Sequence, residues 1–517
     1  MASPSLVRSR RRNAGQLHAL VTLQREIQAT DPNGRRKYLR DFSEAFRDYR
    51  SLLTLEQVEA ELSQADVVLI GDYHALPASQ RFAMRILERM ARSGRPVVLG
   101  VETIFARDQH ILDEWMRGEI DDDDLRERIR FNLDWGYDWE PFRELLATAR
   151  QQGAHAVGLD CMPRDDLRKI GTRDRHAAQK IAEIVRRHPS AIVLVLFGES
   201  HLAPNHIPEV LRVALPDAGI VTLLQNIDHL YWRAAGESRE RVEAVRVESD
   251  VICVFNATPL EKYESYRQCI ERWRQETAAP DLAPTFYNLV DALARFLRID
   301  KYAAHNGTQP VYLVDRMPEV CSLPSDEALR KLLERKGADE GEMKEILARI
   351  ASGGSCFVPR LNAIHVREFQ MVGGAEEAAR FVHHACRPST PSSEAAMSST
   401  EEKFYVHVIE HALGYFGSRV LFPERSAVRG FELGATSAHP REAVADHSQL
   451  TAGQFALAAQ NLGYILGSEL YDAYVAGCLS KRYIRSLFFR KLNGPAARSI
   501  YLQIAHKARW QRRTALS

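Results

Sequence analysis

Short runs of aliphatic residues recur along the first half of the chain, separated by stretches with a helical period. Val67–Ile70 is one such run and Leu194–Phe197 is another, and neither alternates between apolar and polar residues. Unalternated runs of this length are typical of strands that are buried on both faces in a parallel sheet. The segments between the runs, such as residues 79–90, repeat their apolar residues with a helical period. Residues 60–260 are therefore expected to form an α/β fold, a mostly parallel sheet with helices on both faces.

Three parts of the chain depart from this strand and helix alternation. The connection over residues 103–153 is longer than a crossover helix requires, which predicts a helical lid insertion at the carboxyl edge of the sheet. The patterns after residue 260 predict an α+β extension and then a mainly helical C-terminal domain. The expected divisions are a helical extension at 1–59, the α/β domain at 60–260, the α+β extension at 261–386, a linker at 387–400 and the helical domain at 401–517.

Two predicted strands end in the same short motif, which is Gly, an acid, any residue and His. Gly71–His74 follows the first run, Gly198–His201 follows the second, and Glu102 stands just past a third run at Val97–Val101. Ligands bind beyond the carboxyl ends of parallel strands, and neighbouring strands lie only about 4.8 Å apart. These tips are therefore expected to converge on one site. The candidate metal-binding or acid–base residues are Asp72, His74, Glu102, Glu199 and His201.

Two kinds of interpretation compete for these strand-end residues. Carboxylates at strand ends commonly cap the helix or turn that follows, whereas histidine is not a preferred cap. As a functional set, two imidazoles with carboxylates suit Zn²⁺, Mn²⁺ or Co²⁺ and an activated water. Haem would instead require an axial Tyr or His in an apolar slot. The residues leave the cofactor open between haem and a divalent metal, and the ligand between a porphyrin and another small molecule.

An aromatic block within the predicted lid is a candidate surface for a flat ligand. Aromatic side chains stack on flat ligands, but they also form the small core of a helical insertion, so both interpretations stand. The candidate cofactor contacts are Tyr73, Trp135, Tyr137 and Trp139, and the candidate catalytic residues are His74, Glu102 and His201.

The order of these motifs resembles the ChaN haem-binding uptake domain, over about residues 60–260. The superfamily also contains Tiki-type metal-dependent proteases and erythromycin-esterase-like hydrolases. The resemblance implies haem at the strand ends in the ChaN branch, and metal binding or general-base chemistry by the histidines and the acid in the other branches. Asp72 stands where the family usually has Glu, which retracts the carboxylate by one methylene. The matching segments are Gly71–His74, Glu102, Trp135–Trp139 and Gly198–His201.

The composition of the chain argues against several classes of binding partner and metal site. The 517 residues carry a net charge of +1, which argues against a dedicated nucleic-acid-binding protein. Seven scattered cysteines without a C-x-x-C pair indicate neither a disulfide framework nor a thiolate zinc site. No apolar run is long enough to span a bilayer, and the first residues form a basic cluster rather than a signal peptide. We therefore expect a cytoplasmic protein without a transmembrane segment.

One further motif lies in the predicted C-terminal domain. His407, Glu410 and His411 match the inverted zincin pattern, which places two histidines and a glutamate on one helix. A chain with 18 histidines produces such a pentapeptide by chance, so a polar helix face is the competing interpretation. Three function hypotheses follow, which are a haem-binding protein, a metal-dependent hydrolase and a non-catalytic interaction scaffold. The C-terminal domain is assigned by default to interaction or homo-oligomer assembly.

Overall fold

The computed structural model divides the chain into two compact units. The first unit is residues 24–280, and the second combines residues 1–23 with residues 281–517. The predicted linker at 387–400 falls outside the described residues except for Thr400, where a helix begins. The structure describes residues 4–31, 42, 44–162, 164, 169–238, 241–275, 281–302, 305–306, 309–310, 313–322, 325–386, 400–426, 452–490, 492 and 497–514.

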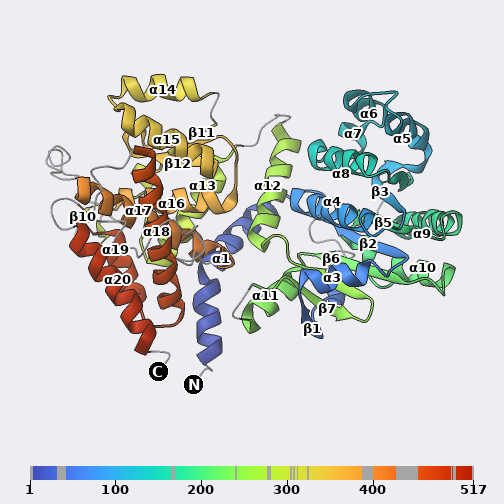
Figure 1. Ribbon diagram of the computed structural model, residues 1–517, viewed down its shortest axis with the longest axis horizontal. Helices are drawn as coiled ribbons and strands as arrows, with labels where there is room; N and C mark the ends of the chain where they lie inside the picture. Colours follow the sequence, from blue (N-terminus) through green and yellow to red (C-terminus); the bar gives the residue numbers. More distant parts are fainter. Residues whose placement is uncertain are drawn as a thin grey trace. The chain divides into compact units, whose positions relative to one another are not determined.

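The first unit is built on an eight-stranded sheet with the order β1-β7-β8-β6-β2-β5-β3-β4 (Figure 1). Neighbours from β8 to β4 pair in parallel, and β1 and β7 form an antiparallel edge. The predicted mostly parallel sheet is therefore confirmed. The strands are β1 (Ser51–Leu53), β2 (Val67–Asp72), β3 (Val97–Phe105), β4 (His155–Asp160), β5 (Ile192–Gly198), β6 (Ile220–Gln225), β7 (Ala244–Glu248) and β8 (Val251–Val254).

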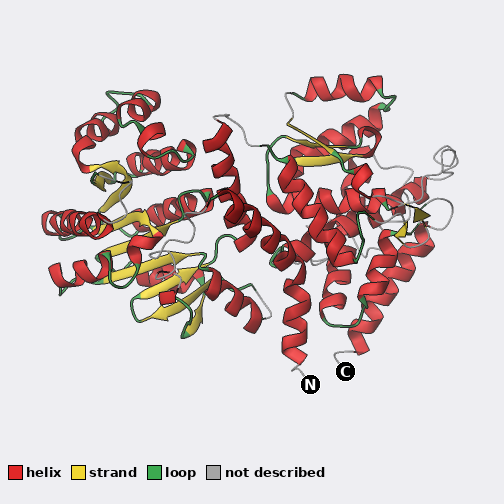
Figure 2. Ribbon diagram, turned by 180° about the vertical axis from the view of Figure 1, so that it is seen from behind, coloured by secondary structure: helices red, strands yellow, loops and turns green. Residues whose placement is uncertain are grey.

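Helices cover both faces of this sheet (Figure 2). They include α3 (Leu55–Leu62), α4 (Pro77–Ala91), α9 (Ile170–Arg187), α10 (Ile207–Ala214) and α11 (Asp228–Glu237). Val68 and Ile70 of β2 pack into one core with α3 and α4, whereas Val67 and Leu69 pack into the other with α9, α10 and α11. Every residue of β2 and β5 is buried, which explains why these strands do not alternate in polarity.

The long connection between β3 and β4 is a helical insertion, as the sequence predicts. It contains α5 (Gln109–Met116), α6 (Asp122–Arg128), α7 (Phe131–Asp134) and α8 (Trp139–Gln151). Trp115 is completely buried in the same core as α4, and its indole donates a hydrogen bond to Asp122 at the start of α6. The last helix of the unit, α12 (Pro259–Gln275), also contacts the insertion, since Trp273 donates to the Gly136 carbonyl.

The second unit combines a small sheet with many helices, and its C-terminal region is helical, as the sequence predicts. The sheet order is β11-β13-β12, in which β11 pairs in parallel with β13. None of the described helices is long and apolar enough to cross a membrane. The helix α1 (Pro4–Thr30) contributes its residues up to Leu23 to this unit. The other elements are α13 (Ala283–Leu297), β9 (His305–Asn306), β10 (Gln309–Pro310), β11 (Glu319–Ser322), α14 (Asp326–Arg335), α15 (Glu340–Gly353), β12 (Ser355–Val358), β13 (Ala363–Val366), α16 (Met371–Ala385), α17 (Thr400–Leu421), α18 (Ala452–Val475), α19 (Lys481–Phe488) and α20 (Ala497–Thr514).

Candidate functional site

The first strand-end motif fixes the orientation of one imidazole. Asp72 is the last residue of β2, and one of its oxygens lies 2.7 Å from Nδ1 of His74. The other oxygen accepts a hydrogen bond from the Gln80 amide at the start of α4. The His74 ring is therefore held by its Nδ1 side, and its Nε2 faces Glu102 at 3.8 Å. A fifth of the His74 side chain is exposed, at 20%.

Glu102 of β3 lies at the centre of the site. Its carboxylate accepts a hydrogen bond from the Gly198 amide at 2.5 Å and another from Arg173 at 2.6 Å. Burial alone would raise the pKa of Glu102, but His201, His74, Arg173 and the Gly198 amide outweigh it and lower the pKa to about 2. Glu102 is therefore an ionised, buried carboxylate at neutral pH.

The second strand-end motif repeats the arrangement from the opposite side of Glu102. His201 lies in the short helix η4 (Glu199–Leu202) directly after β5, and its Nε2 is 3.7 Å from the Glu102 carboxylate. Its Nδ1 is 2.5 Å from Asp174 of α9, and the other oxygen of Asp174 is 2.6 Å from Nδ1 of His206. Both imidazoles are thus held by an aspartate at Nδ1 and direct Nε2 toward one carboxylate, as the predicted convergence requires.

Two arginines balance the negative charge around Glu102. Arg173 of α9 donates to both oxygens of Asp160, each at 2.9 Å, in addition to Glu102. Arg164 donates to Asp160 at 2.6 Å, and its guanidinium lies 4.6 Å from the centre of the Trp135 ring. Buried carboxylates require such partners, because an unpaired buried charge is strongly unfavourable.

Aromatic side chains of the insertion cover His74. The ring centres of Trp135 and Tyr137 are 4.4 and 5.1 Å from that of His74. The indole nitrogen of Trp135 is buried and makes no hydrogen bond within the described part of the chain. Trp139 instead packs on Phe131, with ring centres 4.8 Å apart, inside the core of the insertion. The structure therefore places Trp135 and Tyr137 against the imidazole and Trp139 in a structural position.

Tyr73 and Glu199 belong to a neighbouring polar group. Lys262 of α12 donates to Glu199 at 3.3 Å, and its ammonium group lies 4.5 Å from the centre of the Tyr73 ring. Burial raises the pKa of Glu199 although Lys262 opposes this, and burial also holds the pKa of Tyr73 well above its usual value. Of the candidate residues, these two are therefore turned toward α12, while His74, Glu102 and His201 face one another.

The sequence interpretation missed the partners that reach the site from helices. Arg173 and Asp174 stand near the start of α9, and Lys262 lies on α12. No strand-end motif marks such residues, because their roles depend on how the helices pack on the sheet. The only sign of these partners in the sequence is the adjacent pair Arg173 and Asp174, on the helix that follows the strand ending in Asp160. Such a pair is equally expected at an ordinary solvated helix end.

The donor set around Glu102 does not form a metal centre. No group of three or more His, Cys, Asp or Glu side chains in the described ranges is arranged to hold a metal ion. The oxygens of Glu102 are occupied by a guanidinium and an amide N–H, which repel a cation from the position between the two imidazoles. A bare divalent ion therefore does not fit these residues as they are placed.

The inverted zincin motif of α17 is also not assembled. His407 is 3.2 Å from Glu345 through Nδ1, whereas His411 accepts a hydrogen bond at Nδ1 from Arg380, 2.5 Å away. The two imidazoles thus bind different partners, and one of these is a cation. The polar-face interpretation accounts for the positions of both histidines.

Comparison with known proteins supports the fold of the first unit. Residues 58–174 match the sequence model of the family described as haem-binding uptake, Tiki superfamily, ChaN, which confirms the resemblance drawn from the strand-end motifs. Among curated proteins, no sequence matches the chain significantly.

Three solved structures illustrate the similarity at low sequence identity. ChaN of Campylobacter jejuni, with cofacial haem binding, is 15% identical with a TM-score of 0.29, over 34% of this chain and 86% of that chain. The type III effector HopBA1 is 14% identical with a TM-score of 0.30, over 40% of this chain and 96% of that one. The C-terminal region of Pasteurella multocida toxin, with a thiol-protease-like catalytic triad, is 13% identical with a TM-score of 0.27, over 41% of this chain and 30% of that one.

Proposed function

Since residues 58–174 match the ChaN family, we propose that the first unit binds an iron porphyrin at the carboxyl ends of its strands. The observation that carries the proposal is the environment of His74. Asp72 holds its Nδ1, Trp135 and Tyr137 pack against its ring, and a fifth of its side chain is exposed. An imidazole that is fixed at Nδ1 by a carboxylate presents Nε2 as a metal ligand.

The aromatic rings around His74 favour a flat ligand over a bare ion. Nε2 of His74 is 3.8 Å from Glu102, which is too far for a hydrogen bond. Trp135 offers a flat apolar ring and an unpartnered indole N–H, and Arg164 lies over the same ring. When bound, the porphyrin iron would supply a Lewis-acidic centre. The chain would contribute His74 as the ligand, the aromatic surfaces and the Trp135 indole N–H as a hydrogen-bond donor.

A haem titration tests this proposal directly. Haemin added to the purified full-length protein should give a saturable change in the visible absorption spectrum. His74→Ala should remove the change, while His188→Ala, at an exposed position on the same unit, should leave it intact. A spectrum that saturates equally in the His74→Ala variant, or none at all in the unchanged chain, contradicts the assignment. Metal analysis of the same preparation tests the alternative of a divalent ion.

A second candidate is a hydrolase that uses the same residues in acid–base chemistry. The supporting observation is that two imidazoles, each oriented by an aspartate, flank the ionised Glu102. Such an imidazole can take a proton from water while a buried carboxylate stabilises the resulting imidazolium. Because a divalent ion does not fit the site, this activity should survive treatment with a chelator. A panel of small esters and lactones is the set of substrates to screen.

The two candidates respond differently to one substitution. Glu102→Gln removes the charge that stabilises an imidazolium and should reduce ester hydrolysis by roughly 10²-fold or more. It leaves Nε2 of His74 available, so haemin binding should persist. Loss of hydrolysis on chelation would instead indicate the metal-dependent chemistry of the wider superfamily.

A further inference from the structure

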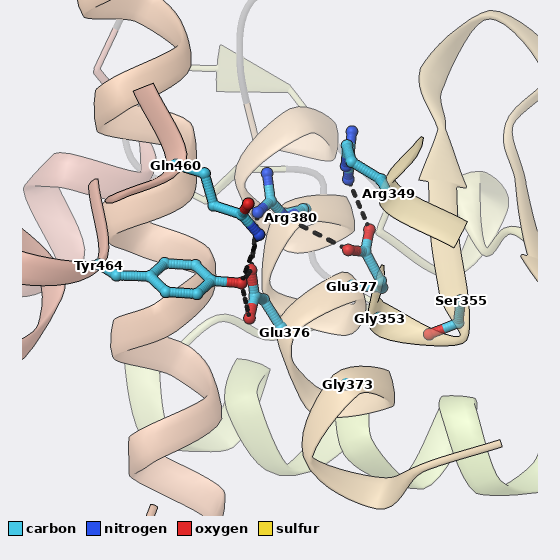
Figure 3. Close-up of a pocket in the computed structure, with 9 residues that line it drawn as sticks. All are labelled: Arg349, Gly353, Ser355, Gly373, Glu376, Glu377, Arg380, Gln460 and Tyr464. Atoms are coloured by element: carbon cyan, nitrogen blue, oxygen red, sulfur yellow. Dashed lines mark hydrogen bonds and ion pairs between the residues drawn. The ribbon is translucent and has the colours of Figure 1, made fainter. Parts of the chain in front are cut away.

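A polar cavity lies within the second unit, whose function the family match does not cover. It has about 30 Å³ of space that water-sized molecules can occupy, enclosed by α15, β12, α16 and α18 (Figure 3). A space of this size holds a few non-hydrogen atoms. The lining residues are Arg349, Gly353, Ser355, Gly373, Glu376, Glu377, Arg380, Gln460 and Tyr464.

The cavity has a buried charged floor and a more accessible rim. Ser355 is 2% exposed and Arg380 is 8% exposed, so both are inaccessible except through the cavity. Gln460 and Tyr464 of α18 are only partly buried and lie together at the other side in Figure 3. The α18 side is therefore less buried than the floor.

The charged side chains at the floor are paired with one another. Arg349 donates to Glu377 at 2.8 Å, Arg380 donates to Glu376 at 2.7 Å, and Arg425 donates to Glu376 at 2.9 Å. Two guanidinium groups and two carboxylates thus line the cavity, and Arg425, which does not line it, adds a third guanidinium beside Glu376. A guanidinium group carries five N–H donors, so a carboxylate partner does not exhaust them.

The two carboxylates accept further hydrogen bonds from the protein. Glu376 accepts from Tyr464 at 2.9 and 3.0 Å in addition to its arginines. Glu377 accepts from the Phe357 amide at 2.7 Å. Both acids are therefore engaged by donors of the protein, with the hydrogen bonds of Glu377 on one oxygen and its ion pair with Arg380 on the other.

Two buried donors at the floor remain unused within the described residues. The Ser355 hydroxyl has no hydrogen-bond partner, and in Figure 3 it points toward the side on which Glu377 and Arg380 lie. Nε of Arg380 is 3.3 Å from Glu377 as an ion pair, but it makes no hydrogen bond. Buried donors are nearly always satisfied in native proteins, so these two call for an acceptor.

The neighbouring histidine is consistent with a positive potential in the cavity. Burial, together with the charges of Arg380 and Arg349, holds the pKa of His411 well below its usual value. His411 is thus neutral and accepts a hydrogen bond from Arg380.

We propose that this cavity binds a small oxyanion, such as phosphate, sulfate or a short carboxylate. Arg349 and Arg380 provide the charge, and Ser355 provides a neutral donor at the floor. Guanidinium groups recognise planar and tetrahedral oxyanions through paired N–H donors. Gly373 allows α16 to approach Gly353 closely at the edge of the cavity, because an added Cβ would lie 2.7 Å from the Gly353 carbonyl.

The test is anion binding to the full-length protein. Calorimetric titration with phosphate, sulfate, acetate and chloride at matched ionic strength should give saturable heat for the oxyanions but not for chloride. Comparison of the affinities for phosphate and acetate shows whether the cavity prefers a tetrahedral or a planar oxyanion. Ser355→Ala removes one donor and should weaken binding roughly fivefold. Ser468→Ala, a buried serine that is hydrogen-bonded to Arg419 outside the cavity, is the matched control and should bind normally.

Two further variants keep the proposal open to contradiction. Arg349→Gln should reduce binding more than Ser355→Ala, whereas Glu377→Gln should strengthen it by removing a repelling carboxylate. If Arg349→Gln fails to fold, the Ser355→Ala and Glu377→Gln variants decide. Absence of saturable oxyanion binding, equal binding by Ser355→Ala and the unchanged chain, or weaker binding by Glu377→Gln overturns the proposal. Haemin titration of Ser355→Ala separates this site from the proposed porphyrin site, because that spectrum should not change.

Discussion

At the scale of single residues, the strand-end site is held together by compensation of buried charge. Glu102 stays ionised because His74, His201 and Arg173 surround it, and Arg173 in turn bridges to Asp160. Such groups contribute to stability as a set, since the removal of one partner leaves the others buried and unpaired.

Replacement of Arg173 by Met should therefore destabilise the first unit by about 3–5 kcal/mol, because Glu102 and Asp160 both lose their buried partner. Urea unfolding, monitored by tryptophan fluorescence, measures this loss of stability, since five of the six tryptophans lie at residues 115–273. Arg117→Met is the control, at an arginine whose side chain is 57% exposed, and it should not shift the transition. An equal effect of both substitutions would refute the charge-compensation argument.

A histidine of the second unit gives a prediction for pH dependence. Burial lowers the pKa of His407, but the hydrogen bond and charge of Glu345 and the charge of Glu410 outweigh it, so the pKa is raised. The pKa of Glu345 is lowered, despite its burial, by the hydrogen bond and charge of His407. A histidine whose pKa is raised by folding stabilises the folded state. This stabilisation is complete at pH values below the unfolded-state pKa of about 6.5, and it is lost as the pH rises above the folded-state pKa.

His407→Gln should accordingly cost about 1 kcal/mol at pH 5.5, where Glu345 is still ionised, and almost nothing at pH 9. Differential scanning calorimetry at both pH values gives the two differences. Leu502→Gln, at a position of α20 that is 52% exposed and carries no titratable group, should show no such dependence. A cost for His407→Gln that grew with pH would have the wrong sign for this pair.

At the scale of elements, the sequence predicted most of what positions the site. The unalternated runs identified β2 and β5, and the shared motif predicted that their tips carry His74 and His201. These features are local and repeat in the sequence. The ring of Trp139 and the helix-borne partners of Glu102 could not be predicted in the same way, because their places depend on the packing of α8 and α9.

The glycines of the two motifs have different structural roles. A Cβ on Gly198 would lie 3.0 Å from Glu102 Oε2 and 3.1 Å from His74 Nε2, whereas one on Gly71 would meet nothing closer than 3.4 Å. Gly198→Ala should therefore disturb the space between Glu102 and His74 and weaken haemin binding roughly tenfold, as expected for a methyl group forced into a packed site. Gly71→Ala should bind almost normally. Equal affinities of the two variants in a spectrophotometric titration would argue against a ligand at Glu102 and His74.

At the scale of the whole molecule, the chain builds its second unit from both of its ends. Residues 1–23 group with residues 281–517, through the buried side chains of Ala19, Leu20 and Leu23 among others. The sequence pattern predicted a helix here but not its partner, because the amphipathic stripe does not say which distant helix covers it.

Removal of residues 1–23 should therefore weaken the second unit, and the missing helix should be replaceable in trans. A peptide of residues 4–23 added to a protein lacking residues 1–23 is expected to raise its Tm saturably, because backbone carbonyls of the helix accept from Asn288 and Tyr471. A Gly15→Ala peptide should not rescue, since the added Cβ would come within 2.5 Å of the Val420 carbonyl. A Leu17→Ala peptide, altered at a side chain that is 39% exposed, should rescue normally. Identical rescue by the Gly15→Ala peptide, or no loss of stability on truncation, would show that the N-terminal helix contributes little to the packing of this unit.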